Sequence, residues 1–165
     1  MIARIQDIKP LLAEARANPQ AAFPAIRELA ASEQWQTREV AATALVEIGK
    51  HHQVAVLRQA RLWARDRNGN VRRAASEGLR GIVKVDPESV RPVLESLNAD
   101  SDLYVRKSVG NVLRNASGKH AEFVLDLCRR WARSPDARTQ WIVKDGLRKL
   151  KASRPREVAA IVGTR

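Results

Sequence analysis

Residues 71–79 read VRRAASEGL, and similar blocks recur along the chain at a fixed spacing. Three of them align with it without gaps at steps of 34 residues: TREVAATAL at 37–45, VRKSVGNVL at 105–113 and TQWIVKDGL at 139–147. All four blocks end in leucine: Leu45, Leu79, Leu113 and Leu147. The same step links the residues that end the preceding segments: Leu29, Trp63, Leu97 and Trp131. A fixed period of this size predicts a repeat architecture.

Each unit reads as two helices. Within 70–84, Val71, Ala75, Gly78 and Ile82 share one face of a helix, with polar residues opposite them. The partner helices are expected at 23–32, 54–65, 87–98 and 120–133, and end helices at 7–16 and 155–162, with residues 164 and 165 frayed. No alternating apolar run flanked by hairpin turns indicates a strand. The sequence predicts one all-α domain over 1–165, with about ten helices.

The charge balance points to a polyanionic partner. Of the 165 residues, 30 are Lys or Arg and 18 are Asp or Glu, which gives a net charge of +12. Nucleic acid is the first class of partner that this charge favours, and an acidic membrane surface is the second. Charge predicts attraction and no particular chemistry.

The few cysteines and histidines exclude several kinds of site. A single cysteine, Cys128, rules out an intramolecular disulfide framework and a cysteine-rich zinc site. His51, His52 and His120 lack a metal-ligand spacing. No apolar run approaches a membrane span, and residues 1–9 lack a signal-peptide core. We therefore expect a cytoplasmic protein without a metal or other cofactor.

The loops between the helices favour one repeat class. A period of 34 residues also suggests tetratricopeptide repeats, but no unit carries their Trp-x-x-Leu-Gly-x-x-Tyr pattern. Instead Asp66 precedes Arg72, and Asp100 precedes Arg106, by six positions. This resembles HEAT repeats, in which such residues form a ladder between neighbouring units. We assign Arg38, Arg72 and Arg106 to this structural role, and Cys128, Trp63 and Trp131 to the core.

A second set of cations also follows the repeat. Arg80, Arg114 and Arg148 lie seven residues after Arg73, Lys107 and Trp141, which is two helical turns. Stacked units would align these residues in a stripe able to follow a phosphate backbone. The alternative is the solvated face of an ordinary solenoid. Trp141 stands where the preceding units carry cations, so we expect it either to stack on a base or sugar or to pack at the rim.

Glu77 is the candidate for chemistry. It belongs to a column of polar residues, Thr43, Glu77, Asn111 and Asp145. Arg73 and Arg80 lie about one turn before and after it, so one interpretation is an ion pair within the helix. The other is a carboxylate held among cations in order to stabilise a cationic sugar or base.

Three longer runs carry a family resemblance: WARDRNGNVRRAASEGLR at 63–80, DLYVRKSVGNVL at 102–113 and FVLDLCRRW at 123–131. They are similar to the DNA alkylation repair family of DNA glycosylases, of the AlkC and AlkD type. The resemblance implies a right-handed solenoid that holds double-stranded DNA on a concave basic face and excises N3- or N7-alkylated bases. Glu77 matches a glutamate of the family, and Glu39 is a weaker match to a second one.

Two departures from that family bear on catalysis. Val85 stands where the relatives carry a tryptophan, and Asn115 where they carry an aspartate. We therefore expect a monomer that binds DNA, alkylated or not, through Arg73, Arg80, Lys107, Arg114, Trp141 and Arg148, with weak or absent catalysis. An active glycosylase and a protein-interaction scaffold are the alternatives.

Overall fold

The computed structural model describes residues 3–163, and all regular structure in that range is helical. The α-helices are α1 (Lys9–Ala17), α2 (Pro19–Ala31), α3 (Trp35–Gly49), α4 (Gln53–Trp63), α5 (Gly69–Glu77), α6 (Pro87–Leu97), α7 (Leu103–Ala116), α8 (Ala121–Trp131), α9 (Ala137–Gly146), α10 (Leu150–Ser153) and α11 (Pro155–Val162). Short 3-10 helices are η1 (Ile5–Ile8), η2 (Gly78–Arg80) and η3 (Ile82–Lys84). The prediction of an all-α repeat fold is confirmed. Residues 164 and 165, expected to fray, lie outside the described range.

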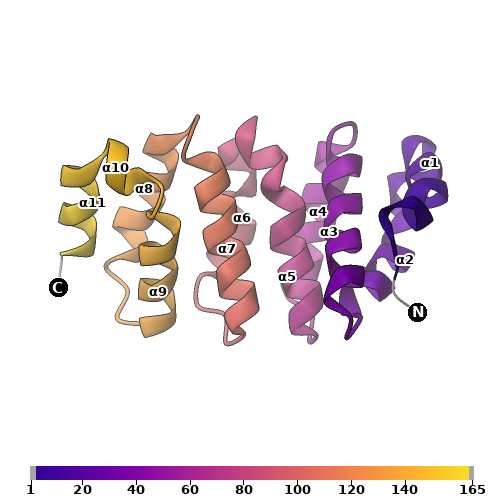
Figure 1. Ribbon diagram of the computed structural model, residues 1–165, viewed down its shortest axis with the longest axis horizontal. Helices are drawn as coiled ribbons and strands as arrows, with labels where there is room; N and C mark the ends of the chain where they lie inside the picture. Colours follow the sequence, from indigo (N-terminus) through magenta and orange to yellow (C-terminus); the bar gives the residue numbers. More distant parts are fainter. Residues whose placement is uncertain (1–2, 164–165) are drawn as a thin grey trace.

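The helices form two layers along one axis. Helices α3, α5, α7 and α9 lie side by side in front, α4 and α6 lie behind them, and α1 and α11 lie at opposite ends (Figure 1). We call α3, α5, α7 and α9 the inner layer, and α2, α4, α6, α8 and α11 the outer layer. The leucines that end the four blocks, Leu45, Leu79, Leu113 and Leu147, are at most 2% exposed. The repeat columns are therefore the core between the layers.

The remaining residues assigned to the core are also buried. Trp63 and Trp131 are each 5% exposed, and Phe23 meets Trp63 edge-on with the ring centroids 6.3 Å apart. Cys128 is fully buried, and burial raises the pKa of its thiol to about 12. That thiol stays protonated and acts as a small apolar side chain.

Side-chain caps set where three inner helices begin. Asn68, Asp102 and Asp136 occupy one repeat column, and each accepts a hydrogen bond from the amide two residues ahead, at 2.7–2.8 Å. Such caps satisfy amides that the first helical turn leaves free, and each contributes about 1 kcal/mol. Pro87 and Pro155 open α6 and α11, as predicted.

The helix expected over 70–84 is interrupted. The α-helix α5 ends at Glu77, and the chain continues as η2 and η3. Gly78 lies so close to Leu45 that an added Cβ would come within 2.7 Å of the leucine Cβ. Gly146 meets Leu113 in the same way at the end of α9, whereas α3 and α7 carry Ala44 and Val112 in this column and run on. Glycine weakens a helix interior by about 1 kcal/mol relative to alanine, so the helices break where glycine occupies the column.

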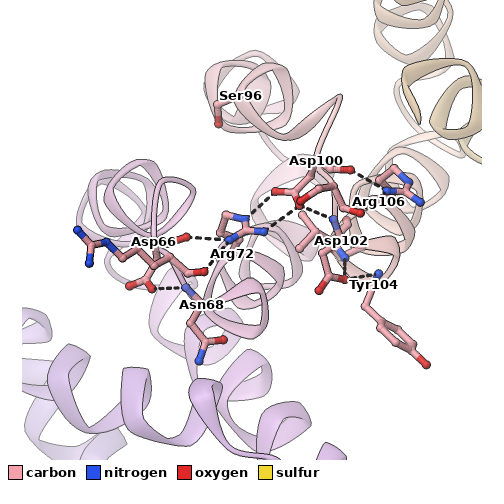
Figure 2. A network of polar contacts seen from close by, with 12 residues as sticks. Asp66, Asn68, Arg72, Ser96, Asp100, Asp102, Tyr104 and Arg106 are labelled. Atoms are coloured by element: carbon pink, nitrogen blue, oxygen red, sulfur yellow. Dashed lines mark hydrogen bonds and ion pairs between the residues drawn. The ribbon is translucent and has the colours of Figure 1, made fainter. Parts of the chain in front are cut away.

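The Asp–Arg ladder forms one complete rung between units. The Arg72 guanidinium donates to both carboxylate oxygens of Asp100, at 2.7 and 3.0 Å, and to the carbonyl of Asp66 at 2.9 Å (Figure 2). Arg106 donates to the carbonyl of Asp100, but its Nε is buried without a partner. The next residue of the aspartate column is Ser134, which offers no carboxylate. The structural role assigned to these arginines is confirmed.

Candidate nucleic-acid interface

Polar side chains follow one another across the inner layer. We call this set the polar row; its residues are Glu39, Arg73, Glu77, Arg80, Asn111, Arg114, Asp145 and Arg148. They come from α3, α5 with η2, α7 and α9 with the turn that follows it. Most of the candidate site residues predicted from the sequence belong to it.

Glu77 lies at the centre of the polar row and is only 6% exposed. It is the last residue of α5, so the helix break places it where the chain turns. Arg80 Nε donates to the carbonyl of Glu77 at 3.0 Å and lies 3.2 Å from Oε2 of its carboxylate. Asn111 Nδ2, from the next unit, donates to the same Oε2 at 3.1 Å. One buried carboxylate is thus held by an arginine and an amide.

Burial raises the pKa of the Glu77 carboxyl above its ordinary value. The charges of Arg80 and Arg73 and the hydrogen bond from Asn111 act in the opposite direction, and the charge of Glu39 adds slightly to the rise. The loss of hydration outweighs the nearby cations. A carboxylate in this state gains from any further positive charge brought beside it.

Asn111 takes the place beside Glu77 that the sequence suggested for Asn115. Asn115 Nδ2 donates to the carbonyl of Asn111 at 2.9 Å and to its Oδ1 at 3.3 Å. Because Oδ1 of Asn111 is occupied as an acceptor, its Nδ2 faces Glu77. Asn115 therefore reaches the carboxylate through Asn111. The spacing of 34 residues between Glu77 and Asn111 was the available signal for this contact.

Arg73 pairs with Glu39 of the preceding unit. The ion pair that the sequence suggested between Arg73 and Glu77 does not form in the described residues, although the Arg73 charge still acts on Glu77. A separation of 34 residues in sequence places Glu39 directly across the interface between α3 and α5. The two predicted catalytic glutamates therefore flank one arginine.

Asp145 engages both remaining arginines of the polar row. It forms an ion pair with Arg114 of α7 and lies 3.5 Å from Arg148 Nε. Gly110 makes room for it, because a Cβ there would overlap the Asp145 carboxylate. The side chain of Arg148 is 63% exposed, whereas that of Arg114 is 16% exposed. Arg148 is thus the most accessible arginine of the predicted stripe.

The other two predicted contact residues lie nearer the start of the inner helices. Lys107 is exposed, and its Nζ lies 5.1 Å from the centre of the Tyr104 ring, which is itself 62% exposed. Trp141 is half-buried and packs against the core. With Arg133 and Lys144 it lines a groove of about 610 Å³ beside α9. The rim packing considered for Trp141 is observed, and its indole edge still borders an open, basic groove.

Two further kinds of site are absent from residues 3–163. No group of three His, Cys, Asp or Glu residues is placed to hold a metal ion. No helix there is both long and apolar enough to cross a bilayer. Val85, where the resembling family carries a tryptophan, is 77% exposed at the end of η3.

Comparison with known proteins points to one family. A model of the family described as DNA alkylation repair enzyme matches residues 11–150. The uncharacterized protein YhaZ of Bacillus subtilis is 32% identical over 147 residues, which are 84% of this chain and 40% of YhaZ.

Two solved structures share the fold. The alkylpurine DNA glycosylase AlkC of Pseudomonas fluorescens, bound to DNA containing an abasic site analog, superposes with a TM-score of 0.78 at 29% identity, over 92% of this chain and 43% of AlkC. AlkD2 of Streptococcus mutans gives 0.68 at 28% identity, over 80% of this chain and 67% of AlkD2. The chain thus spans less than half the length of YhaZ and of AlkC.

Proposed function

Because the chain belongs to the DNA alkylation repair enzyme family, we propose that this HEAT-like array binds double-stranded DNA across the polar row of its inner layer. The observation that carries the proposal is the alignment of four arginines from successive units around the buried Glu77. The net charge of +12 and the DNA bound by AlkC support it. The protein would act as a cytoplasmic monomer, as one domain, without a metal.

The ion pairs of the polar row shape how it would bind phosphate. Arg73, Arg80 and Arg114 already contact carboxylates, so a phosphate gains from them only by sharing or replacing those contacts. Arg148 and Lys107 are more exposed and meet the backbone first. With these five cations engaged, log K falls against log salt with a slope of roughly −4 to −5.

We propose in addition that base excision is weak or absent. Excision needs a charge placed to within about half an ångström of the sugar, and a group that presses on the lesion. Glu77 is buried and its Oε2 is already in contact with Arg80 and Asn111, and Asn115 supplies an amide and no charge. Val85 offers no aromatic surface. The raised pKa and the low exposure of Glu77 are what favour the alternative, an active glycosylase that stabilises a cationic sugar.

DNA affinity is tested with two triple-alanine variants of equal charge. The inner-face variant replaces Arg80, Arg114 and Arg148. The outer-face variant replaces Arg58, Arg61 and Arg65 in and after α4. The inner-face variant loses affinity for a duplex and its salt slope drops by about 2 to 3, while the outer-face variant keeps both. Equal losses in the two variants would show a non-specific charge effect. Weak binding by the parent and by both variants would favour a protein-interaction scaffold.

Base release is tested on alkylated duplex DNA. The parent protein releases little or no methylated base, and Asn115→Asp, alone or with Val85→Trp, raises the release without strengthening the binding of undamaged DNA. The reason is that an aspartate restores a carboxylate near Glu77. Glu77→Gln is the control. Robust release by the parent that Glu77→Gln abolishes would establish the glycosylase alternative.

A further inference from the structure

The solvent-facing side of α4 carries an exposed stripe that the polar row does not use. Val54, Arg58, Arg61, Leu62 and Arg65 are spaced by 4, 3, 1 and 3 residues, which places them on one face of the helix and of the turn that continues it. Val54 is 78% exposed and Leu62 is 63% exposed, and the three arginines are exposed as well. We call these five residues the α4 stripe. Helix α4 lies behind α3 and α5, away from the viewer in Figure 1.

The repeat shows that the fold does not require aliphatic residues in this stripe. The positions equivalent to Val54 in the other units are Gln20, Glu88 and Glu122. Those equivalent to Leu62 are Glu28, Ser96 and Arg130. The other outer helices place polar residues at the same two points and pack in the same layer. Val54 and Leu62 therefore present apolar surface that the packing of the units leaves unexplained.

The charges of the α4 stripe also lack internal partners. On the neighbouring outer helices arginines meet carboxylates: Arg91 meets Glu88 at 2.6 Å, and Arg130 meets Glu95 at 3.3 Å. Residues 53–65 contain no Asp or Glu, and Arg58, Arg61 and Arg65 form no ion pair with any residue that the structure describes. Three like charges on one exposed face repel one another, and a surface of opposite charge relieves that repulsion.

We infer that the α4 stripe docks an acidic amphipathic helix of a partner protein. Carboxylates of that helix would face Arg58, Arg61 and Arg65, and its aliphatic side chains would cover Val54 and Leu62. The stripe runs over eleven residue steps, about 17 Å, which matches roughly three turns of a partner helix. This site is independent of the polar row and of the proposed DNA binding.

A DNA duplex fits the α4 stripe less well than an acidic helix does. Phosphates gain nothing from Val54 and Leu62, which are two of the most exposed aliphatic side chains described. A duplex is wider than one helix and would also lie over α6, where Glu88 and Glu95 have side chains 65% and 42% exposed. These carboxylates would repel it. A single helix can lie along α4 and avoid them.

The test uses a synthetic helical peptide of about 14 residues that carries Glu and Leu along one face. Its binding to the full chain is measured by fluorescence anisotropy, beside a peptide of equal charge in which Gln replaces each Leu. The variants are Leu62→Gln, the triple alanine at Arg58, Arg61 and Arg65, and the control Ser96→Gln, which changes the matching exposed position on α6. Circular dichroism and duplex affinity confirm that each variant is folded.

The parent chain binds the Glu/Leu peptide and binds the Glu/Gln peptide several-fold more weakly. Leu62→Gln weakens binding about fivefold, from lost apolar contact, and Ser96→Gln does not. The triple alanine weakens binding most at low salt, because exposed charges are screened at high salt. The inference is overturned by any of three results: no peptide binding at about 1 mM, equal binding of the two peptides, or a loss of duplex affinity in the triple alanine as large as that of the inner-face variant.

Discussion

Replacing Arg72 by methionine tests the ladder of Figure 2 as a source of stability. The change keeps most of the apolar stem and removes the guanidinium that donates to Asp100 at 2.7 and 3.0 Å and to the carbonyl of Asp66. The Asp100 side chain is 7% exposed, so it cannot regain full hydration when its partner is lost. Leaving a buried charge without its partner costs about 3 kcal/mol. For a chain of this length that lowers the Tm by about 6 to 12 °C.

The pH dependence of this loss gives an independent check. Burial alone would raise the pKa of the Asp100 carboxyl, but the hydrogen bonds from Arg72 and from the Asp102 amide and the nearby arginine charges hold it below its usual value. A carboxylate with a lowered pKa stabilises the fold above its unfolded pKa, and that contribution is lost as the pH falls through the folded pKa. The difference between parent and Arg72→Met is therefore largest near neutral pH and shrinks in acid.

Chemical denaturation of both proteins from pH 7 down to about pH 3 measures that difference. Arg138→Met is the matched control, because Arg138 pairs with Asp136 where both side chains are more exposed, 47% and 28%. Exposed pairs contribute about 0.2 to 1 kcal/mol. A loss for Arg72→Met no larger than that of Arg138→Met, or one that is the same at all pH values, would refute the reasoning.

Two further predictions concern the polar row and the helix breaks. Asn111→Ala removes an amide that donates to the Glu77 carboxylate, so the pKa of Glu77 rises further, as a carbon-13 NMR titration of that carboxyl measures; an unchanged pKa would show that Asn111 does not act on it. Gly146→Ala forces a Cβ to within 2.6 Å of Leu113 Cδ1 and lowers the free energy of unfolding by about 1 to 3 kcal/mol, whereas Gly118→Ala, with nothing within 4 Å, is neutral or stabilising. Equal effects of the two alanines in urea unfolding would contradict the packing argument.

The repeat made much of the fold predictable from the sequence. A column such as that of Leu45 identifies the buried side of a helix, because equivalent residues occupy equivalent environments in each unit. Amphipathic periodicity then places the helices, but it does not reveal that α5 ends at Glu77. That break depends on how closely Leu45 approaches Gly78 across a unit boundary, and periodicity within one segment carries no information about such a distance.

The polar contacts were predictable only as neighbourhoods. The spacing placed Arg73 near both Glu39 and Glu77, and the choice between them depends on which carboxylate its guanidinium reaches. In the same way it suggested that Asn115 lies near Glu77 without showing that Asn111 stands between them. Pairings among several polar groups of similar reach are settled by ångström-scale geometry, and the sequence does not encode that directly.

The interrupted inner helices give the array a longer unit of construction than its sequence period. Junctions of leucine with glycine, Leu45 with Gly78 and Leu113 with Gly146, recur after 68 residues, and the column carries Val112 between them. Two kinds of unit therefore alternate, one with a continuous inner helix and one with a broken helix. Since each unit touches only its neighbours, excising 34 residues would set two broken helices side by side, whereas excising 68 keeps the alternation. Lengthening or shortening such a protein by whole pairs of units is the change its architecture accommodates.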